Sequence, residues 1–208
     1  MDTPPVPEGT LVHDLHEGPD LPERVAAGRR AAAAARLVVA GLAGTDADVA
    51  TLAESAAALE RLADALEPHT PTTRWDRPEH RYEAHPLIGP SNPLAPPMRV
   101  ERHGQTAVGT VTFGHPYEGP KGHVHGGFVA AMFDIICISA ASVAQVAGLT
   151  GTLTVRYRAR TPLFREIRYE ARVEEVRART ATVTGRSFLD GTLLAEAEGI
   201  FVRVTGSP

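Results

Sequence analysis

The chain has 208 residues, of which 43% are hydrophobic and 22% charged, and its formal net charge is -4. This composition is typical of a globular protein with a sizeable core, and it provides no basic field for nucleic acid. A single cysteine, Cys137, excludes an internal disulfide framework and indicates a reducing compartment. Because the first residues also lack the basic start and apolar core of a signal peptide, we expect a cytoplasmic protein.

Two alanine-rich helices are predicted in the first third of the chain. Residues 1–19 are rich in proline, glycine and acidic side chains, and we expect them to be poorly ordered. Asp20 can cap a first helix over residues 21–42. The capping-box pattern at residues 45–48 begins a second helix that ends near Leu66. We interpret the pair as a packing or oligomer-stabilising extension, because no chemistry is visible in it.

A proline-rich segment follows the two helices. Residues 67–97 hold eight of the 17 prolines, together with Trp75. Such a segment cannot form a regular helix or a central strand, so it predicts an extended connector that wraps over the surface. We therefore divide the chain into an N-terminal extension, residues 1–85, and a main domain, residues 86–208.

Alternating apolar and polar residues predict antiparallel strands in the main domain. The first two strands form a hairpin across His103-Gly104, and the last two are joined through Asp190-Gly191, a tight-turn signal. One face of each strand is polar, as in an antiparallel sheet with one solvated side. Small residues at Ala195, Ala197 and Gly199 would let a helix approach the last strand closely. The predicted strands are residues 98–102, 106–113, 152–158, 166–174, 178–188 and 193–204.

A single long helix is predicted between the second and third strands. The run 128–146 is apolar on almost every face, which indicates a helix buried on most sides. It is nearly as long as a transmembrane helix, but Asp134 and three other polar residues interrupt it and no basic flank follows, so we expect no membrane span. An α+β fold, in which the sheet wraps around this one helix, satisfies all of these patterns.

The start of this helix carries the pattern with a chemical meaning. His125-Gly126-Gly127 precedes the apolar run, and Asp134 follows the histidine by nine residues. Amides at a helix start lack intrahelical acceptors and lie at the positive end of the helix dipole. Glycine there lets a bulky group approach the backbone. Asp is rarely buried without a partner. The glycines at the helix start and the acid on the apolar helix therefore both point to a functional site.

With these residues, the layout from about Pro86 to Val204 resembles the hotdog-fold acyl-CoA thioesterases, specifically the phenylacetic-acid-degradation (PaaI-type) branch. Besides the His-Gly-Gly and Asp134, the resemblance is carried by Thr150, sixteen residues after the aspartate, and by the bend at Thr161-Pro162-Leu163. It implies a hotdog fold, an antiparallel sheet wrapped around one long central helix. The implied activity is hydrolysis of acyl-CoA to a free carboxylic acid and coenzyme A.

The resemblance also assigns roles to individual residues. It places the Gly126 amide in the oxyanion hole, where preorganised donors contribute strongly to catalysis, and gives His125 a supporting role. Asp134 matches a catalytic carboxylate, which acts either as a general base or as a nucleophile; the sequence leaves both roles open. Thr150 matches a hydroxyl that helps to hold the water or the acid.

Substrate, partner and cofactor expectations follow from the same resemblance. Gly127 and Phe128 are expected to contact the substrate, and Arg158 is a candidate contact for a coenzyme A phosphate. The oxyanion donors and the acid of one site are expected from two subunits, which implies a homodimer and, beyond it, a dimer of dimers. No metal or redox cofactor is implied, and the H-x-H pair His123 and His125 lacks the further ligand spacing of a zinc site.

Two other functions stay open at this point. A hotdog protein without catalytic activity would bind acyl-CoA as a sensor, and a hotdog enoyl-CoA hydratase would need a histidine acting as acid and base with a second acid. Asp134 and Thr150 fit hydrolysis better than hydration. We expect Cys137 to be an inert small hydrophobe and Tyr157 to belong to the core. The sequence does not indicate which acyl group is bound.

Overall fold

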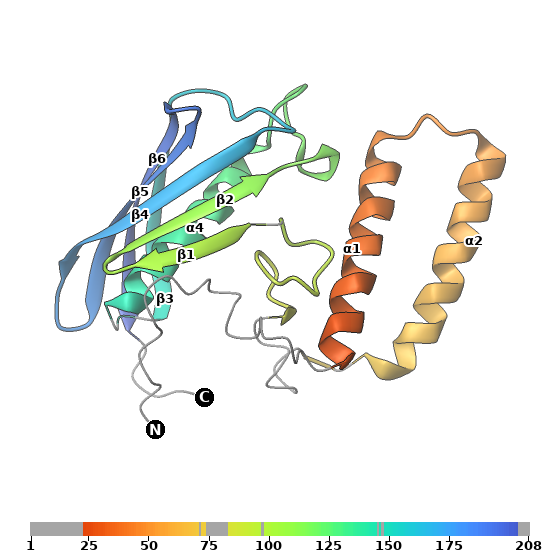
Figure 1. Cartoon of the computed structure of the whole chain (residues 1–208), viewed down its shortest axis with the longest axis horizontal. Coiled ribbons are helices and arrows are strands. Elements are labelled where there is room, and N and C mark those ends of the chain that lie inside the picture. The colour runs from red at the N-terminus through yellow and green to blue at the C-terminus, as the bar shows by residue number, and fades with distance from the viewer. Residues whose placement is uncertain are drawn as a thin grey trace.

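The apolar run forms the central helix, and the strands wrap around it (Figure 1). This computed structural model describes residues 23–70, 72–73, 83–96, 98–144, 146 and 148–203. Its helices are α1 (Glu23–Gly44), α2 (Val49–Leu66) and α4 (Gly126–Val143), with short 3-10 turns η2 (Glu67–His69) and η4 (His115–Tyr117). Its strands are β1 (Arg99–His103), β2 (Thr106–Thr112), β3 (Gly148–Tyr157), β4 (Glu166–Val176), β5 (Thr180–Leu189) and β6 (Thr192–Arg203).

The strands form one antiparallel sheet in the order β1-β2-β4-β5-β6-β3. The predicted hairpin of β1 and β2 is confirmed, with Gly104 at a positive φ of 55°. The tight turn between β5 and β6 is confirmed too, because Asp190 and Gly191 both have positive φ, 49° and 81°, as a two-residue hairpin loop requires. The predicted α+β fold is therefore confirmed, and β3 lies at one edge of the sheet.

The core lies between α4 and the concave face of the sheet. Met132, Phe133 and Ile136 of α4 are fully buried, which is why the run is apolar on most faces. The helix approaches β5 most closely at Gly185, where an added Cβ would lie 2.9 Å from the Phe133 ring and 3.1 Å from the Cys137 sulfur. A side chain at position 185 would therefore displace the helix.

The prediction that the small residues of β6 let the helix approach this strand closely is correct only in part. Ala195 and Ala197 are buried under the helix as expected. The helix does not pack against Gly199, because the space beside its Cα is filled by the ring of Phe201, 2.7 Å from where a Cβ would stand. Strand alternation identified the small residues but not their neighbours, because neighbours depend on sheet order and side-chain conformation.

The N-terminal extension is attached through α1. The Arg29 guanidinium contacts the buried Glu83 carboxylate with two nitrogens, at 2.7 and 3.1 Å, and the Ser91 hydroxyl donates to the same carboxylate at 2.7 Å. Arg36 donates to the Asn92 and Pro90 carbonyls at 2.8 and 3.1 Å. A bidentate Arg–carboxylate pair fixes orientation as well as distance, so these contacts fix α1 to the loop before β1.

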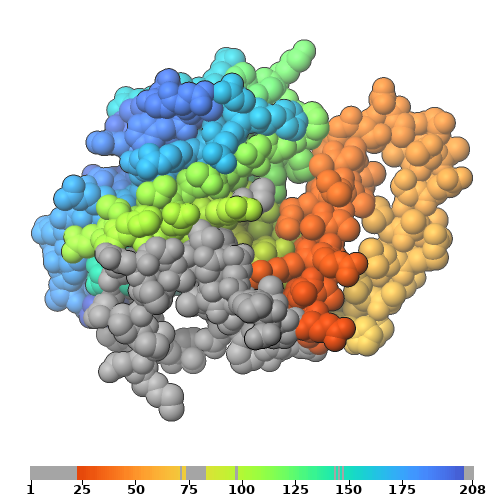
Figure 2. Space-filling view, in the orientation of Figure 1, coloured from red at the N-terminus to blue at the C-terminus, as the bar shows by residue number. Residues whose placement is uncertain are grey.

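The second helix stands apart from the sheet, and none of its residues is buried (Figures 1 and 2). Its N-cap is Asp48, which accepts from the Thr51 amide at 2.8 Å. The predicted capping box is wrong in its first member, because Thr45 accepts instead from Ala47 at 3.0 Å. The predictions for residues 1–19, for Asp20 and for Trp75 lie outside the described residues. In the part of the chain that the structure describes, no helix is long and apolar enough to cross a membrane.

We predict that replacing Glu83 releases α1 from the loop before β1. Glu83→Gln removes the charge of the carboxylate that the Arg29 guanidinium contacts with two nitrogens, and breaking such a largely buried pair costs about 3 kcal/mol. Hydrogen exchange followed by mass spectrometry should show faster exchange across α1. Arg165→Gln is the matched control, since its ion pair with Asp190 is exposed and contributes less than about 1 kcal/mol. Equal exchange of α1 in the wild type and Glu83→Gln would contradict this role.

We also predict that Cys137 does not react in the folded protein. It is fully buried on α4, and burial, with a smaller effect of the Asp134 carboxylate, raises the pKa of its thiol to about 12. At about pH 8 such a thiol is ionised in only ~10⁻⁴ of molecules, so it is a poor nucleophile. Iodoacetamide should label it only after denaturation, as read by mass spectrometry. Labelling of the native protein at the rate of a free cysteine would refute this prediction.

Candidate functional site

The first turn of α4 presents one free backbone donor. His125 precedes the helix in an extended conformation (φ −63°, ψ 133°), and its Nδ1 accepts from the Gly127 amide at 3.0 Å. The Phe128 amide bonds to the His125 carbonyl at 3.0 Å. No acceptor among the described residues contacts the Gly126 amide. The first amides of a helix have no intrahelical acceptor, so this N–H is available to an acceptor from outside the helix, and His125 acts as the helix cap.

Tyr157 lies over the same turn, a position that its sequence pattern does not predict. Its hydroxyl donates to the Gly126 carbonyl at 2.8 Å, and a Cβ at position 126 would stand 3.4 Å from its ring. The prediction that Tyr157 belongs to the core is wrong, since the residue is 54% exposed. It follows the alternating Leu153 and Val155, but β3 is an edge strand and its last residue projects over the helix start. Only the sheet order reveals this.

Asp134 and Thr150 form the second group of functional side chains. The Thr150 hydroxyl donates to the Asp134 carboxylate at 2.6 Å. Thr150 lies within β3 and not before it, at a bulge where Gly151 is the extra residue. A bulge re-aims the neighbouring side chain, here toward α4. In the single chain Asp134 is half-buried and Thr150 exposed, so the carboxylate is less enclosed than the apolar run predicted.

One chain does not bring the two groups to a single point. Gly126 and Asp134 are eight residues apart on one continuous helix, which separates them by about 12 Å along its axis at 1.5 Å per residue. A thioester carbonyl is far smaller than this. The Gly126 amide and the Asp134 carboxylate of the same chain therefore cannot act on one carbonyl group.

The predicted substrate contacts lie at the surface around the helix start. Gly127 is exposed, and Phe128 is half-buried, with its ring edge-on to Tyr117 at 4.9 Å. Arg158, at the end of β3, is paired with Glu196 of β6 through Nε and Nη2, at 2.8 and 2.7 Å. Its guanidinium is thus already bonded to a carboxylate, and its role toward a phosphate stays a prediction.

The histidines near the helix start do not converge. His123 Nδ1 lies 2.7 Å from the Lys121 carbonyl, His115 pairs with Glu118 at 3.7 Å, and the His125 nitrogen faces the Gly127 amide. Within the described ranges, no three His, Cys, Asp or Glu side chains are grouped so that they could hold a metal ion.

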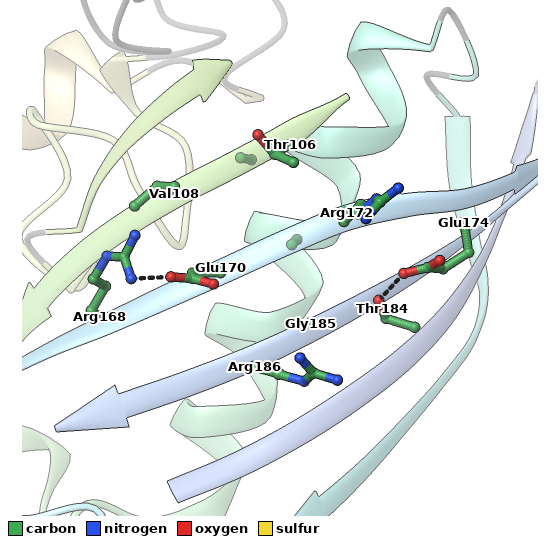
Figure 3. A pocket seen from close by; sticks show the side chains of 11 residues that line it. Thr106, Val108, Arg168, Glu170, Arg172, Glu174, Thr184, Gly185 and Arg186 are labelled. Carbon is green, nitrogen blue, oxygen red and sulfur yellow. Dashed lines mark hydrogen bonds and ion pairs between the residues drawn. The ribbon is translucent and has the colours of Figure 1, made fainter. Parts of the chain in front are cut away.

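A separate open groove of about 460 Å³ lies on the outer face of the sheet (Figure 3). Arg168 and Glu170 are paired along β4, and Glu174 accepts from Thr184 at 2.7 Å. The groove shares no residue with the groups at Gly126 and Asp134. Its charges neutralise one another in part, as on an ordinary solvated sheet face, so we assign no chemistry to it.

Comparison with known proteins agrees with this geometry. The Thioesterase superfamily model matches residues 121–196, which include every site residue named above. The crystal structure of a thioesterase superfamily protein is 36% identical, with a TM-score of 0.75 over 84% of this chain and 94% of that one. Because 84% of the chain exceeds residues 86–208, that protein shares part of the N-terminal extension.

Two more distant structures are similar over about half of the chain. Zebra fish thioesterase superfamily member 2 is 18% identical, with a TM-score of 0.49 over 51% of this chain and 81% of its own. A phenylacetic acid degradation-related protein from Ralstonia eutropha JMP134 is 20% identical, with a TM-score of 0.46 over 50% and 82%. Neither adds weight to the assignment at such scores. The family model and the 36% identical structure establish that the chain belongs to the thioesterase superfamily and has the hotdog fold.

Proposed function

We propose that this protein hydrolyses acyl-CoA thioesters to a free carboxylic acid and coenzyme A. Membership of the thioesterase superfamily supports thioester hydrolysis in general. The single observation that carries the proposal further is that one helix carries both a free helix-start amide, at Gly126, and a carboxylate, Asp134, that is held by the Thr150 hydroxyl. These are the two groups that acyl transfer requires, an oxyanion donor and a base or nucleophile.

In the proposed reaction the thioester carbonyl oxygen accepts a hydrogen bond from the Gly126 amide. That oxygen gains negative charge as the tetrahedral intermediate forms, and a donor fixed by the fold stabilises it without reorganisation. His125 and Tyr157 hold the first turn in place through their bonds to the Gly127 amide and the Gly126 carbonyl. A donor fixed in this way keeps its geometry when the substrate binds.

Asp134 has two chemically balanced roles in this scheme. As a general base it takes a proton from water while the water oxygen attacks the carbonyl carbon. As a nucleophile its carboxylate oxygen attacks directly, and water then hydrolyses the mixed anhydride. In both routes the thiolate of coenzyme A leaves and takes up a proton. The Thr150 hydroxyl occupies Oδ1, which leaves Oδ2 for the chemistry, and neither route uses a metal or a redox cofactor.

We further propose that two chains build each site. The 12 Å between Gly126 and Asp134 along α4 is spanned if the helix of a second chain runs antiparallel to the first, so that the amide of one faces the carboxylate of the other. The outer edge of β3 is unpaired and its Leu149 is 68% exposed, and an unpaired edge is a natural place for strand pairing. The minimal active unit is thus a homodimer, and two such dimers form the expected dimer of dimers.

The first test is thiol release from a panel of acyl-CoAs by wild type and Asp134→Asn. We expect kcat to fall by about 10²- to 10⁴-fold in the mutant, because the base or nucleophile is lost while the side-chain shape is kept. Thr150→Val should lower kcat by a smaller factor. Thr150→Ser keeps the hydroxyl that donates to Asp134, so its kcat should be close to that of the wild type. Tight acyl-CoA binding without turnover in both proteins would indicate a sensor, and hydration of an enoyl-CoA would indicate a hydratase.

The Gly126 donor can be removed without breaking the helix. Position 126 is the first residue of α4 and His125 before it is extended, and both conditions suit proline, which lacks the N–H. Gly126→Pro should lower kcat by about 10²- to 10³-fold. Gly126→Ala adds the same Cβ, 3.4 Å from Tyr157, but keeps the amide, so it is the matched control and should stay active.

Mixing the two inactive variants tests the shared site. In a heterodimer of Asp134→Asn with Gly126→Pro, one site combines the intact amide of one chain with the intact carboxylate of the other. Random exchange of subunits makes half of the dimers mixed, with one intact site each, so about a quarter of wild-type activity should return. If activity does not rise after unfolding and refolding the mixture together, the site is not shared between chains.

A further inference from the structure

Four residues form a row across the sheet beneath α4. The strand register places Tyr169 of β4 opposite Ser187 of β5, Ser187 opposite Ala195 of β6, and Ala195 opposite Tyr157 of β3. Directly opposite residues of antiparallel strands project from the same face. That face is the one covered by the helix, because the Tyr169 ring packs edge-on to Phe133 of α4 at 5.1 Å.

The two members of the row farthest from Tyr157 carry hydroxyls that have no partner among the described residues. Tyr169 and Ser187 are both fully buried, and neither hydroxyl has a hydrogen-bond partner among the described residues. Leaving a buried hydroxyl unpaired is unfavourable, and each instance requires an explanation. Ser139, which is also buried, shows the usual solution, since its hydroxyl donates to the Ile135 carbonyl at 2.8 Å.

The row leads from these hydroxyls to the start of α4. At its outer end the Tyr157 hydroxyl bonds to the Gly126 carbonyl, next to the amide proposed to hold the thioester. Burial, and to a smaller extent the nearby Tyr157 hydroxyl, raise the pKa of Tyr169, so Tyr169 remains a neutral donor. Between Ser187 and Tyr157 the row has only Ala195, the smallest side chain after glycine.

We propose that the hydroxyls of Tyr169 and Ser187 form the far end of the acyl-binding site and select acyl groups that carry a hydrogen-bonding group. The inference rests on the proposed hydrolysis at Gly126. Two strand spacings separate β3 from β5, so the polar group lies roughly 10 Å from the thioester carbonyl. It is neutral, such as a hydroxyl, because the neighbouring Phe133 and Cys137 provide no countercharge and an ionised group would be buried unpaired.

The test uses substrates that differ only in that group. Hexanoyl-, octanoyl- and decanoyl-CoA are prepared with and without a hydroxyl on the terminal carbon. Wild type is compared with the double variant Tyr169→Phe and Ser187→Ala, which removes both hydroxyls and little volume. Ser139→Ala is the matched control, because it removes a buried serine hydroxyl that is already bonded to the helix.

We expect kcat/KM of the wild type to favour the hydroxylated substrate at one of the three chain lengths by ~10-fold, as a pair of hydrogen bonds to a buried site allows. The double variant should lose this preference, so that its kcat/KM is the same for the hydroxylated and the plain substrate, while Ser139→Ala keeps the preference. A wild type without preference at any length, or a preference that survives in the double variant, would overturn the inference.

Two measurements distinguish a failure of this inference from a failure of the proposed hydrolysis. Binding of the matching thioether analogues, which cannot be hydrolysed, is measured by calorimetry on the same proteins, so the preference is read even if no thioester turns over. Loss of turnover on all substrates overturns the proposed function alone. Thermal unfolding of the unliganded double variant should be unchanged or at higher temperature, because unpaired hydroxyls are removed. A clear fall in its Tm would show that internal water already satisfies them, and would overturn the inference.

Discussion

The burial of α4 against the concave face of the sheet determines where every functional group in this chain can lie. A helix that is apolar on most faces has to be covered by the sheet, and Gly185 sets how near β5 can come. The same packing leaves the first turn of the helix at the edge of the sheet, where the Gly126 amide has no acceptor among the described residues. The helix thus contributes to the core through its body and to the site through its N-terminus.

The rigidity of this helix has a further consequence. Side chains and amides on one continuous helix keep a fixed separation, so Gly126 and Asp134 cannot move together to meet a substrate. The bonds from His125 and Tyr157 hold the first turn, and the bulge at Gly151 brings Thr150 to Asp134. Each group is therefore held in place by itself, and in the proposed homodimer a second chain supplies the other one.

Two exposed surfaces lie at the edges of the molecule. The edge strand β3 is largely exposed, and α2 exposes Leu52, Leu59 and Leu66 at seven-residue spacing. The extension is fixed to the domain through Arg36 of α1, which donates to the Asn92 and Pro90 carbonyls. These features are consistent with the interpretation of the extension as a packing element, since no group on its described helices is placed to take part in the chemistry at Gly126.

Local patterns in the sequence by themselves determined the order of helices and strands and the two hairpin turns, whereas the helix start at His125-Gly126-Gly127 was indicated through the resemblance to thioesterases. They did so because periodicity, capping and turn preference act over a few residues. The pairing of Asp134 with Thr150 was indicated only through the resemblance to thioesterases. The exposure of Tyr157, the Arg29–Glu83 pair and the row of Tyr169 and Ser187 were decided by the tertiary structure alone. Each depends on how segments far apart in the chain pack or pair with one another, which no local pattern contains.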